Sequence, residues 1–164
     1  FIAIDGPHDA HITPKGVKLK MIDVQEIDVF NDDFVIQTGS PHYVQFVDQI
    51  DQFDVFSGGK TIRNSPAFAE EGINVNFVER TVEGITVRTY ERGVEDETLS
   101  CGTGATAAAI AHYLEKESTQ KKYSQKLQTQ GGALTVTFEK KSRSFENIFL
   151  CGPAVRVFEG EITL

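Results

Sequence analysis

The strongest signal for the fold is Cys101-Gly102-Thr103-Gly104-Ala105-Thr106-Ala107-Ala108-Ala109-Ile110-Ala111-His112-Tyr113-Leu114, which carries no formal charge. A surface helix keeps a polar face, whereas a helix that is apolar all round is buried all round. We therefore predict a helix from Gly102 to about Glu117 in the interior of the molecule. Its small side chains let neighbouring backbones come close, which favours a sheet curled around the helix. An ordinary two-layer sandwich of helix on sheet is the alternative.

The rest of the chain is rich in predicted strands. Val17 to Met21 and Ile85 to Tyr90 alternate in polarity with period two, which is the pattern of half-buried strands. In Ile73 to Glu79 we expect the apolar positions, rather than the two asparagines, to face the core. Further strands are predicted at 1–4, 11–13, 27–30, 34–38, 43–47, 126–130, 134–140, 148–151 and 155–158. The expected fold class is α+β, a mixed or antiparallel sheet rolled into a barrel around one central helix, in a single domain over residues 1–164.

Two local predictions concern the weaker parts of the pattern. A turn at Asp5-Gly6-Pro7 is expected to join strands 1–4 and 11–13 into a hairpin. Residues 54–63 are predicted as a short helix capped by Asp54, with Gly58-Gly59 as an interruption.

The bulk composition describes an acidic globular domain. The 164 residues are 40% hydrophobic and carry a net charge of −8. Nucleic acids and anionic membrane surfaces attract clustered Lys and Arg, so this charge argues against both as partners. The basic cluster of Lys121-Lys122 with Lys126 is interpreted as part of a solvated loop.

The two cysteines, Cys101 and Cys151, are too few for a disulfide framework, and we expect a reduced, cytoplasmic protein. The longest uncharged run, Leu99 to Leu114, is shorter than the roughly 20 apolar residues of a membrane span. No signal peptide is recognised. Because the chain opens at Phe1 within a predicted strand, we expect it to be a fragment of a longer protein.

Cys101 stands at the first turn of the predicted helix, where backbone N–H groups lack partners and the helix dipole is positive. A thiol there is expected to have a lowered pKa and to act as a base near neutral pH. The N–H groups of Gly102, Thr103 and Gly104 can hold a carboxylate beside it, an arrangement that suits removal of a proton from the adjacent carbon. The acidic run 95–97 would instead raise the pKa of the thiol. The alternative reading of Cys101 is a small buried hydrophobe.

One thiol supplies only half of a site that inverts a stereocentre. Such a reaction needs a base on one face of a planar carbanion and an acid on the other face. Cys101 can serve one face, whereas Cys151 ends the apolar run Ile148 to Cys151 and is predicted to be a core residue. The Gly152-Pro153 that follows it lacks the proline N–H and offers no comparable anion site.

Four motifs in this chain resemble the diaminopimelate epimerase family. They are Gly39-Ser40-Pro41-His42-Tyr43-Val44; Gly72-Ile73-Asn74-Val75-Asn76-Phe77; Tyr90-Glu91-Arg92-Gly93 through Glu97-Thr98-Leu99-Ser100-Cys101-Gly102-Thr103-Gly104; and Gly152-Pro153-Ala154-Val155 with Phe158-Glu159-Gly160. Cys-Gly-Thr-Gly alone would also fit proline racemase-like proteins. In those proteins the residues before the cysteine resemble Asp-Arg-Ser-Pro, which this sequence lacks.

The resemblance implies an enzyme without cofactor or metal, and without pyridoxal phosphate, whose two cysteines interconvert LL- and meso-diaminopimelate for lysine and peptidoglycan synthesis. It also implies two similar domains, each a sheet rolled around a helix, with the active site between them. The first cysteine of the family lies in an N-terminal motif like Cys-Gly-Asn-Gly, which is absent from this sequence. The chain thus resembles the C-terminal domain alone. We expect it to be inactive by itself, with the N-terminal domain as its partner and diaminopimelate as the small-molecule substrate.

The resemblance also assigns roles at matching positions. Cys101 matches the second acid/base, and Gly102 and Thr103 match the backbone donors to the reacting carboxylate. Asn74, Glu91 and Arg92 match residues that grip the distal amino-acid end of the substrate. Glu91 and His42 match positions thought to tune the thiols, and Ser40 replaces the usual Asn, so that it would reach substrate through water.

Each assignment has a simpler alternative. Asn74 could be a strand-edge amide, and His42 could be a loop histidine bonded to backbone. Arg92 could form a surface salt bridge with Glu91 or Glu97. For the whole chain the alternatives are a non-catalytic domain that binds an anion and a proline racemase-like isomerase.

The end of the chain carries one more expectation. The last strand of the family usually crosses to the N-terminal domain, so residues 158–164 are predicted to lack their partner here. We expect an exposed apolar face, or a homodimer that covers it.

Overall fold

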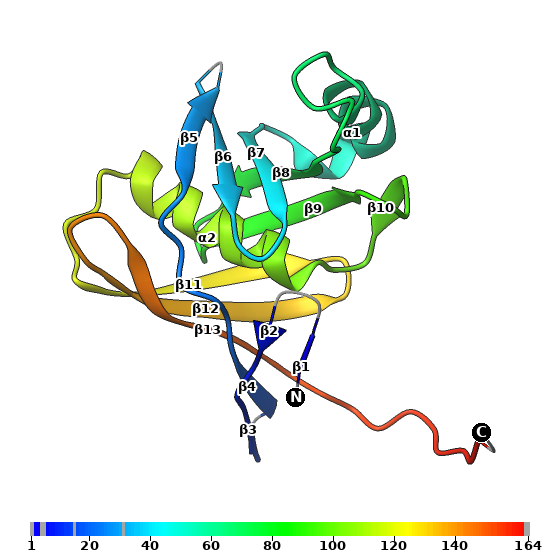
Figure 1. Cartoon of the computed structure of the whole chain (residues 1–164), viewed down its shortest axis with the longest axis vertical. Coiled ribbons are helices and arrows are strands. Elements are labelled where there is room, and N and C mark those ends of the chain that lie inside the picture. Colours follow the sequence, from blue (N-terminus) through cyan, green and yellow to red (C-terminus); the bar gives the residue numbers. More distant parts are fainter. Residues whose placement is uncertain (1, 4–5, 15, 31, 163–164) are drawn as a thin grey trace.

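The computed structural model describes residues 2–3, 6–14, 16–30 and 32–162. Figure 1 shows a long helix lying against a large twisted sheet, with a shorter helix at one corner and an extended C-terminal tail. The fold is α+β with a mixed sheet, which confirms the predicted class.

The helices are α1 (Val55–Arg63), α2 (Gly102–Glu115) and a 3₁₀ turn at Ile50–Gln52. The strands are β1 (Ile2–Ala3), β2 (Gly6–Pro7), β3 (Ala10–Thr13), β4 (Gly16–Lys20), β5 (Ile27–Phe30), β6 (Asp33–Gln37), β7 (Pro41–Phe46), β8 (Asn74–Arg80), β9 (Ile85–Glu91), β10 (Asp96–Thr98), β11 (Lys122–Thr129), β12 (Gly132–Lys140) and β13 (Phe145–Gly152).

Eleven of these strands form one sheet within the described residues. Its order is β3-β4-β13-β12-β11-β9-β8-β7-β6-β5, and β10 pairs with the far end of β9. Most neighbours are antiparallel, but β7 runs parallel to β8 and β11 runs parallel to β9. In the part of the chain that the structure describes, the remaining strands, β1 and β2, pair only with each other.

Helix α2 is the centre of the main core, as predicted. Ten of its residues, from Gly104 to Tyr113, are buried. The helix packs against β6, β7, β8 and β9 and also against β11, β12 and β13, so strands from both halves of the sheet face it. Its run of alanines permits this close approach, because a helix with larger side chains would hold the surrounding strands further away.

One stretch of chain joins the two ends of the sheet around α2. β4 pairs with β13, and the chain then follows β13 through the bond from Met21 N to Ile148 O (2.9 Å) and the bridge between Val24 and Phe145. It continues into β5, which pairs with β6. The end strands β3 and β5 are not paired with each other in the described part of the chain, so strand pairing does not close a barrel.

Helix α1 covers the opposite face of β8 and β9. Asp54 caps it by accepting a bond from Ser57 N at 3.0 Å, as the sequence predicted. The predicted interruption at Gly58-Gly59 is wrong, because the helix runs through both residues. Gly59 instead allows close packing, since a Cβ at this position would lie 2.3 Å from the Cβ of Tyr90.

Two predictions about strands are also wrong. Residues 2–3 pair with β2, and β3 pairs with β4, so the expected hairpin between 1–4 and 11–13 does not form. Phe1, Ile4 and Asp5 of that prediction lie outside the described residues. The expected strand at 155–158 is absent, because the tail leaves the sheet after β13 and meets no strand edge (Figure 1).

The tail presents apolar side chains to solvent. Val155, Val157, Phe158 and Ile162 are 79–85% exposed. The predicted exposed apolar segment is therefore present up to Ile162, while residues 163–164 lie outside the described part. No helix of the described residues has the length and hydrophobicity to cross a membrane.

Candidate active site

Cys101 is the N-cap residue of α2, so its thiol lies at the amino end of the buried helix. Its carbonyl accepts the first helical bond from Ala105 N at 2.8 Å. Its Sγ lies 3.4 Å from the hydroxyl of Thr103, and the backbone N–H groups of Thr103 and Gly104 favour its thiolate. The helix start therefore brings a thiol, a hydroxyl and backbone donors together.

Burial outweighs these donors and raises the pKa of the Cys101 thiol above its usual value. The negative charge of Glu91 raises it further, whereas the bonds to Thr103 and Gly104 oppose the rise. The predicted lowering of the pKa is therefore wrong for the chain by itself, because low-dielectric surroundings disfavour the charged form more than the helix start favours it. The carboxylate whose charge raises the pKa of Cys101 is that of Glu91, and not one of the predicted acidic run 95–97.

His42 lies on β7 and faces the amino end of α2. It is fully buried, and its Nε2 lies 2.9 Å from Thr103 Oγ1 and 3.0 Å from Ser40 Oγ. Its Nδ1 lies 3.0 Å from Asn76 Nδ2. Burial lowers the pKa of His42 from 6.5 to about 3, with a smaller contribution from the positive charge of Arg92, so the imidazole is neutral. The alternative of a loop histidine bonded to backbone is wrong.

Asn74 and Ser40 lie beside this histidine. Asn74 Nδ2 donates to Ser40 Oγ (3.2 Å) and to Pro41 O (3.0 Å), and its Oδ1 accepts the backbone N–H of Arg92 (3.0 Å). The buried amide of Asn74 thus links the start of β7 to the residue after β9. Because Asn74 is in a central strand of the sheet, the alternative of a strand-edge amide is wrong.

Glu91 is the last residue of β9 and Arg92 follows it, next to the same helix start. Glu91 Oε2 accepts a bond from Thr98 Oγ1 at 2.8 Å. Arg92 Nη1 donates to Glu71 O at 2.9 Å, and no ion pair of Arg92 is seen among the described residues. Glu97 instead forms a two-pronged pair with Arg88, with both distances at 2.6 Å. The alternative of a salt bridge from Arg92 to Glu91 or Glu97 is therefore not realised.

Two buried polar residues of the site, Asn76 and Thr89, were not predicted from the sequence. Asn76 bonds His42, and Thr89 Oγ1 donates to Asn76 Oδ1 at 2.9 Å. Asn74 and Asn76 were expected to face away from the core, but both are buried, and the hydrogen bonds of Asn76 lead towards α2. The available signal was their period-two spacing, because residues i and i+2 of a strand share one face.

Cys151 does not join this site. Its neighbour Leu150 faces the helix start, where a Cβ on Gly102 would lie 3.0 Å from Leu150 Cδ2. Successive residues of a strand point to opposite faces, so Cys151 points away from α2. It is half-buried, which is less than a core position, and burial raises the pKa of its thiol.

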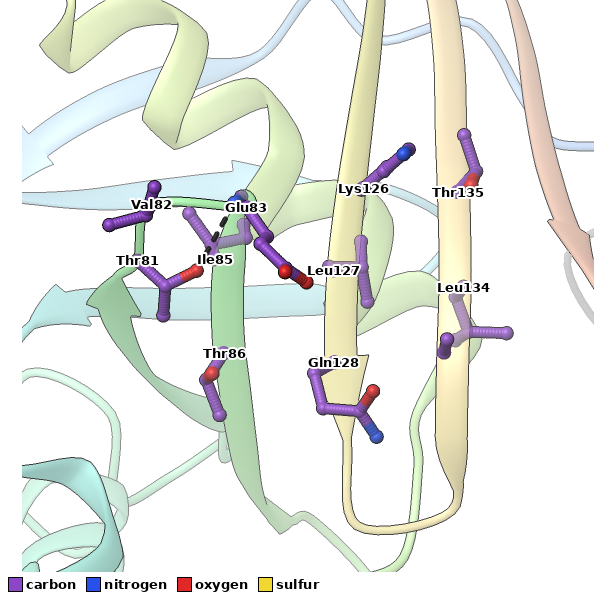
Figure 2. A pocket seen from close by; sticks show the side chains of 12 residues that line it. Thr81, Val82, Glu83, Ile85, Thr86, Lys126, Leu127, Gln128, Leu134 and Thr135 are labelled. Atoms are coloured by element: carbon purple, nitrogen blue, oxygen red, sulfur yellow. Dashed lines mark hydrogen bonds between the residues drawn. The ribbon is translucent and has the colours of Figure 1, made fainter.

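A cavity of about 660 Å³ lies elsewhere, between the β8–β9 turn and the β11–β12 hairpin. Figure 2 shows its lining, including the turn residues Thr81 and Val82 and the strand residues Thr86 and Gln128. None of the candidate site residues contributes to it. The described residues also hold no group of three or more His, Cys, Asp or Glu side chains that could bind a metal ion.

Comparison with solved structures finds proteins that share this fold. The chain is similar to a probable proline racemase from Agrobacterium radiobacter K84 with bound carbonate, with a TM-score of 0.73 and 16% identity over 98% of this chain and 58% of that chain. It is also similar to a phenazine biosynthesis protein of the PhzF family from Bacillus anthracis, with a TM-score of 0.70 and 13% identity over 98% of this chain and 67% of that chain. At these identities the likeness concerns the fold only.

Sequence comparison finds closer relatives. The chain is 48% identical to the diaminopimelate epimerase of Flavobacterium psychrophilum over 99% of this chain and 63% of the relative. It is 46% identical to that of Aquifex aeolicus over 78% of this chain and 45% of the relative, and 38% identical to that of Chlorobaculum tepidum over 100% and 65%. The chain thus spans less than two thirds of the length of these relatives.

The family model described as diaminopimelate epimerase matches residues 34–157. This match runs from β6 to the exposed tail and contains the whole cluster around Cys101. The earlier resemblance in four motifs is confirmed, and the chain belongs to the diaminopimelate epimerase family.

Proposed function

We propose that this chain supplies one half of a site that epimerises LL- to meso-diaminopimelate without a cofactor, with Cys101 as the acid/base on one face of the reacting carbon. The observation that carries the proposal is the position of the thiol at the start of a buried helix, beside backbone donors. A carboxylate bound to those donors would place the adjacent carbon near the sulfur. Negative charge that develops as the proton leaves would then face the same donors.

The raised pKa of the Cys101 thiol fits the acid half of this role. A neutral thiol holds the proton that must be delivered to the carbanion, and a second group must remove a proton from the opposite face. The only other cysteine, Cys151, points away from α2, so it does not supply that group here. We therefore propose that the second base comes from an N-terminal domain.

Arg92 is the proposed anchor for the distal end of the substrate. Its Nε and Nη2 have no hydrogen bond within the described residues, while Nη1 is held by the backbone at Glu71. A guanidinium with free donors in a fixed plane suits a carboxylate. Asn74 and Glu91 flank it and are proposed to complete this end of the site, with Ser40 contributing through water.

The exposed tail is the proposed contact to the N-terminal domain. Its apolar side chains would be buried by a partner strand, or by a second copy of the chain in a homodimer. Co-purification with a separately expressed N-terminal half, and light scattering of the chain alone, distinguish these two partners.

The test is exchange of the α-proton of diaminopimelate in deuterated water. The chain is assayed alone and joined to the part of the Flavobacterium psychrophilum relative that it does not cover. Exchange by the joined protein, and none by the chain alone, is expected. Exchange by the chain alone that is lost in Cys101→Ala would contradict the half-site proposal.

Two controls separate the other functions. If the joined protein exchanges proline rather than diaminopimelate, a proline racemase-like activity replaces the proposal. If diaminopimelate fails to protect Cys101 from alkylation in the joined protein, and no exchange occurs, the anion-binding alternative holds.

A further inference from the structure

A continuous line of hydrogen bonds runs from the interior of the sheet to the thiol. It begins at the backbone carbonyl of Tyr43, passes through Asn76 and His42, and reaches Thr103 and Cys101. Its four links measure 3.1, 3.0, 2.9 and 3.4 Å in that order.

The direction of this line is set at its buried end. Tyr43 O can only accept, so the atom of Asn76 that faces it at 3.1 Å must be the donating Nδ2. The same Nδ2 lies 3.0 Å from His42 Nδ1, which must therefore be the accepting nitrogen. On the other side Asn76 Oδ1 accepts from Thr89 Oγ1, which agrees with this orientation.

A neutral imidazole that accepts at Nδ1 carries its proton on Nε2. That N–H points to the hydroxyl oxygens of Thr103 and Ser40, at 2.9 and 3.0 Å. Thr103 Oγ1 thus receives a hydrogen bond and keeps its own proton for another acceptor. Two acceptors lie 3.4 Å away, the sulfur of Cys101 and Ser40 Oγ, and a thiolate is the stronger of the two.

We propose that Asn76 is a positioning residue that holds His42 in the Nε2–H form, so that Thr103 accepts from His42 and donates its own hydroxyl proton to Cys101 when that residue is a thiolate. Asn76 contacts neither the thiol nor the proposed substrate site, and it acts only through His42. The proposal rests on the proposed function for its role in catalysis, but the state of His42 and of the thiol can be measured without any substrate.

The packing around Asn76 supports this role independently. A Cβ at Gly104 would lie 2.3 Å from Asn76 Oδ1 and 3.3 Å from both Cys101 Cβ and His42 Cε1. The second glycine of Cys-Gly-Thr-Gly therefore leaves the space that the amide occupies next to the thiol. Asn76 is fully buried and lies between α2, β7 and β9.

Two charged groups act on the line besides these residues. Glu91, at the end of β9, opposes ionisation of Cys101, and Arg92 opposes protonation of His42. Neither is changed in the variants below, so differences between those variants report on the hydrogen bonds and on any charge introduced at residue 76.

The first experiment is long-range proton–nitrogen NMR of the full chain, with the His42 signals assigned by loss in His42→Gln. The Nε2–H form is expected near neutral pH. Observation of the Nδ1–H form in the unaltered chain would overturn the proposal. This holds whether or not the chain proves to be part of an epimerase. In Asn76→Asp, the acceptor oxygen should draw the proton to Nδ1.

The second experiment measures the pH dependence of Cys101 alkylation by iodoacetamide in a Cys151→Ala background. Loss of the donor in Thr103→Val should raise the apparent pKa of Cys101 by about one unit, because one charge-assisted bond is lost. Thr103→Ser, which keeps the hydroxyl, should restore it. An unchanged pKa in Thr103→Val would overturn the proposal.

A double-mutant cycle separates the hydrogen-bond route from simple charge. Asn76→Asp also adds a carboxylate, which by itself raises the pKa of the thiol. If the route runs through Thr103, part of the effect of Asn76→Asp disappears when residue 103 is already Val. Full additivity would contradict the route.

Thr89→Val is the matched control, because it removes a bond to Asn76 without changing the orientation set by Tyr43 O. The apparent pKa of Cys101 in this variant should stay within about 0.3 units of the parent value.

Discussion

The two ends of α2 each bury a histidine against a side-chain amide. At the amino end, His42 accepts from Asn76 at Nδ1 and has its proton on Nε2. Near the carboxyl end, His112 Nδ1 lies 2.7 Å from Gln125 Oε1. Gln125 Nε2 donates to Lys126 O, so its oxygen must accept and His112 has its proton on Nδ1. Burial lowers the pKa of both histidines.

The difference lies in what each pair is connected to. The line through His42 leads outward to Thr103 and the thiol. The pair of His112 and Gln125 leads into an aromatic cluster of Tyr113, Tyr123, Phe138 and Phe145, where Tyr123 donates to the same Gln125 oxygen. A buried histidine therefore says little about function until the direction of its bonds is known. The bonds at the amino end of α2 lead to a thiol, whereas those near the carboxyl end lead to aromatic side chains packed in the main core.

The largest expected effect tests whether the thiol at the amino end of α2 takes part in the reaction. Cys101→Ala in the protein joined to an N-terminal half should lower the rate of α-proton exchange by about 10²–10⁴-fold, the usual contribution of one acid/base. Cys151→Ala should stay close to the parent, because its side chain points away from α2. Equal losses in the two variants would contradict the assignment of Cys101.

Acid should destabilise the domain through the buried histidines. The pKa of His42 falls from 6.5 in the unfolded chain to about 3, so only the unfolded state gains a proton between these values. This stabilisation is complete above pH 6.5 and is lost as the pH falls towards 3, with a full size of roughly 4–5 kcal/mol. Urea titrations from pH 7 to 4 should show a smaller slope in His42→Gln. His112→Gln should reduce the slope less, because His112 is less strongly affected. A slope that His42→Gln leaves unchanged would rule out this origin.

A glycine exchange compares two positions within the helix start. Gly104→Ala brings a methyl group to 2.3 Å from Asn76 Oδ1, and it should cost about 1–3 kcal/mol of unfolding free energy and raise the pKa of Cys101. Gly102→Ala meets only the end of the flexible Leu150 side chain at 3.0 Å and should cost less. Urea denaturation and alkylation measure the two effects, and a larger cost at Gly102 would show that the packing argument is mistaken.

The smallest effect belongs to the carboxyl end. Tyr113→Phe removes the bond from the phenol to Gln120 O (2.9 Å) and should lower the free energy of unfolding by about 0.5–1.5 kcal/mol. The alkylation profile of Cys101 should not move. A shift of that profile would mean that the two ends of α2 are coupled, and that the residues near the carboxyl end also influence the Cys101 thiol.

Much of the fold was open to prediction because it depends on local pattern. The uncharged run behind Cys101 predicted a buried helix, and period-two alternation predicted strands such as β9. The prediction failed where the strand that pairs with a segment could not be identified from the sequence, as for β1 and β3. It also failed for the tail after β13, which has no strand edge to pair with among the described residues. Asn76 was misjudged for a related reason, since both faces of β8 are covered and alternation alone cannot tell which face meets α2.

The sequence by itself determined the family, the fold class and the place of the thiol at a helix start, because these depend on residue type and spacing. Only the tertiary structure decided the state of the groups at that helix start. The pKa of Cys101 is raised, not lowered, because burial is a property of all the surrounding strands. The proton of His42 lies on Nε2 because β8 brings Asn76, and β7 brings Tyr43 O, to one point beside the helix. The spacing of residues along the chain determines neither how deeply a side chain is buried nor the direction of its hydrogen bonds.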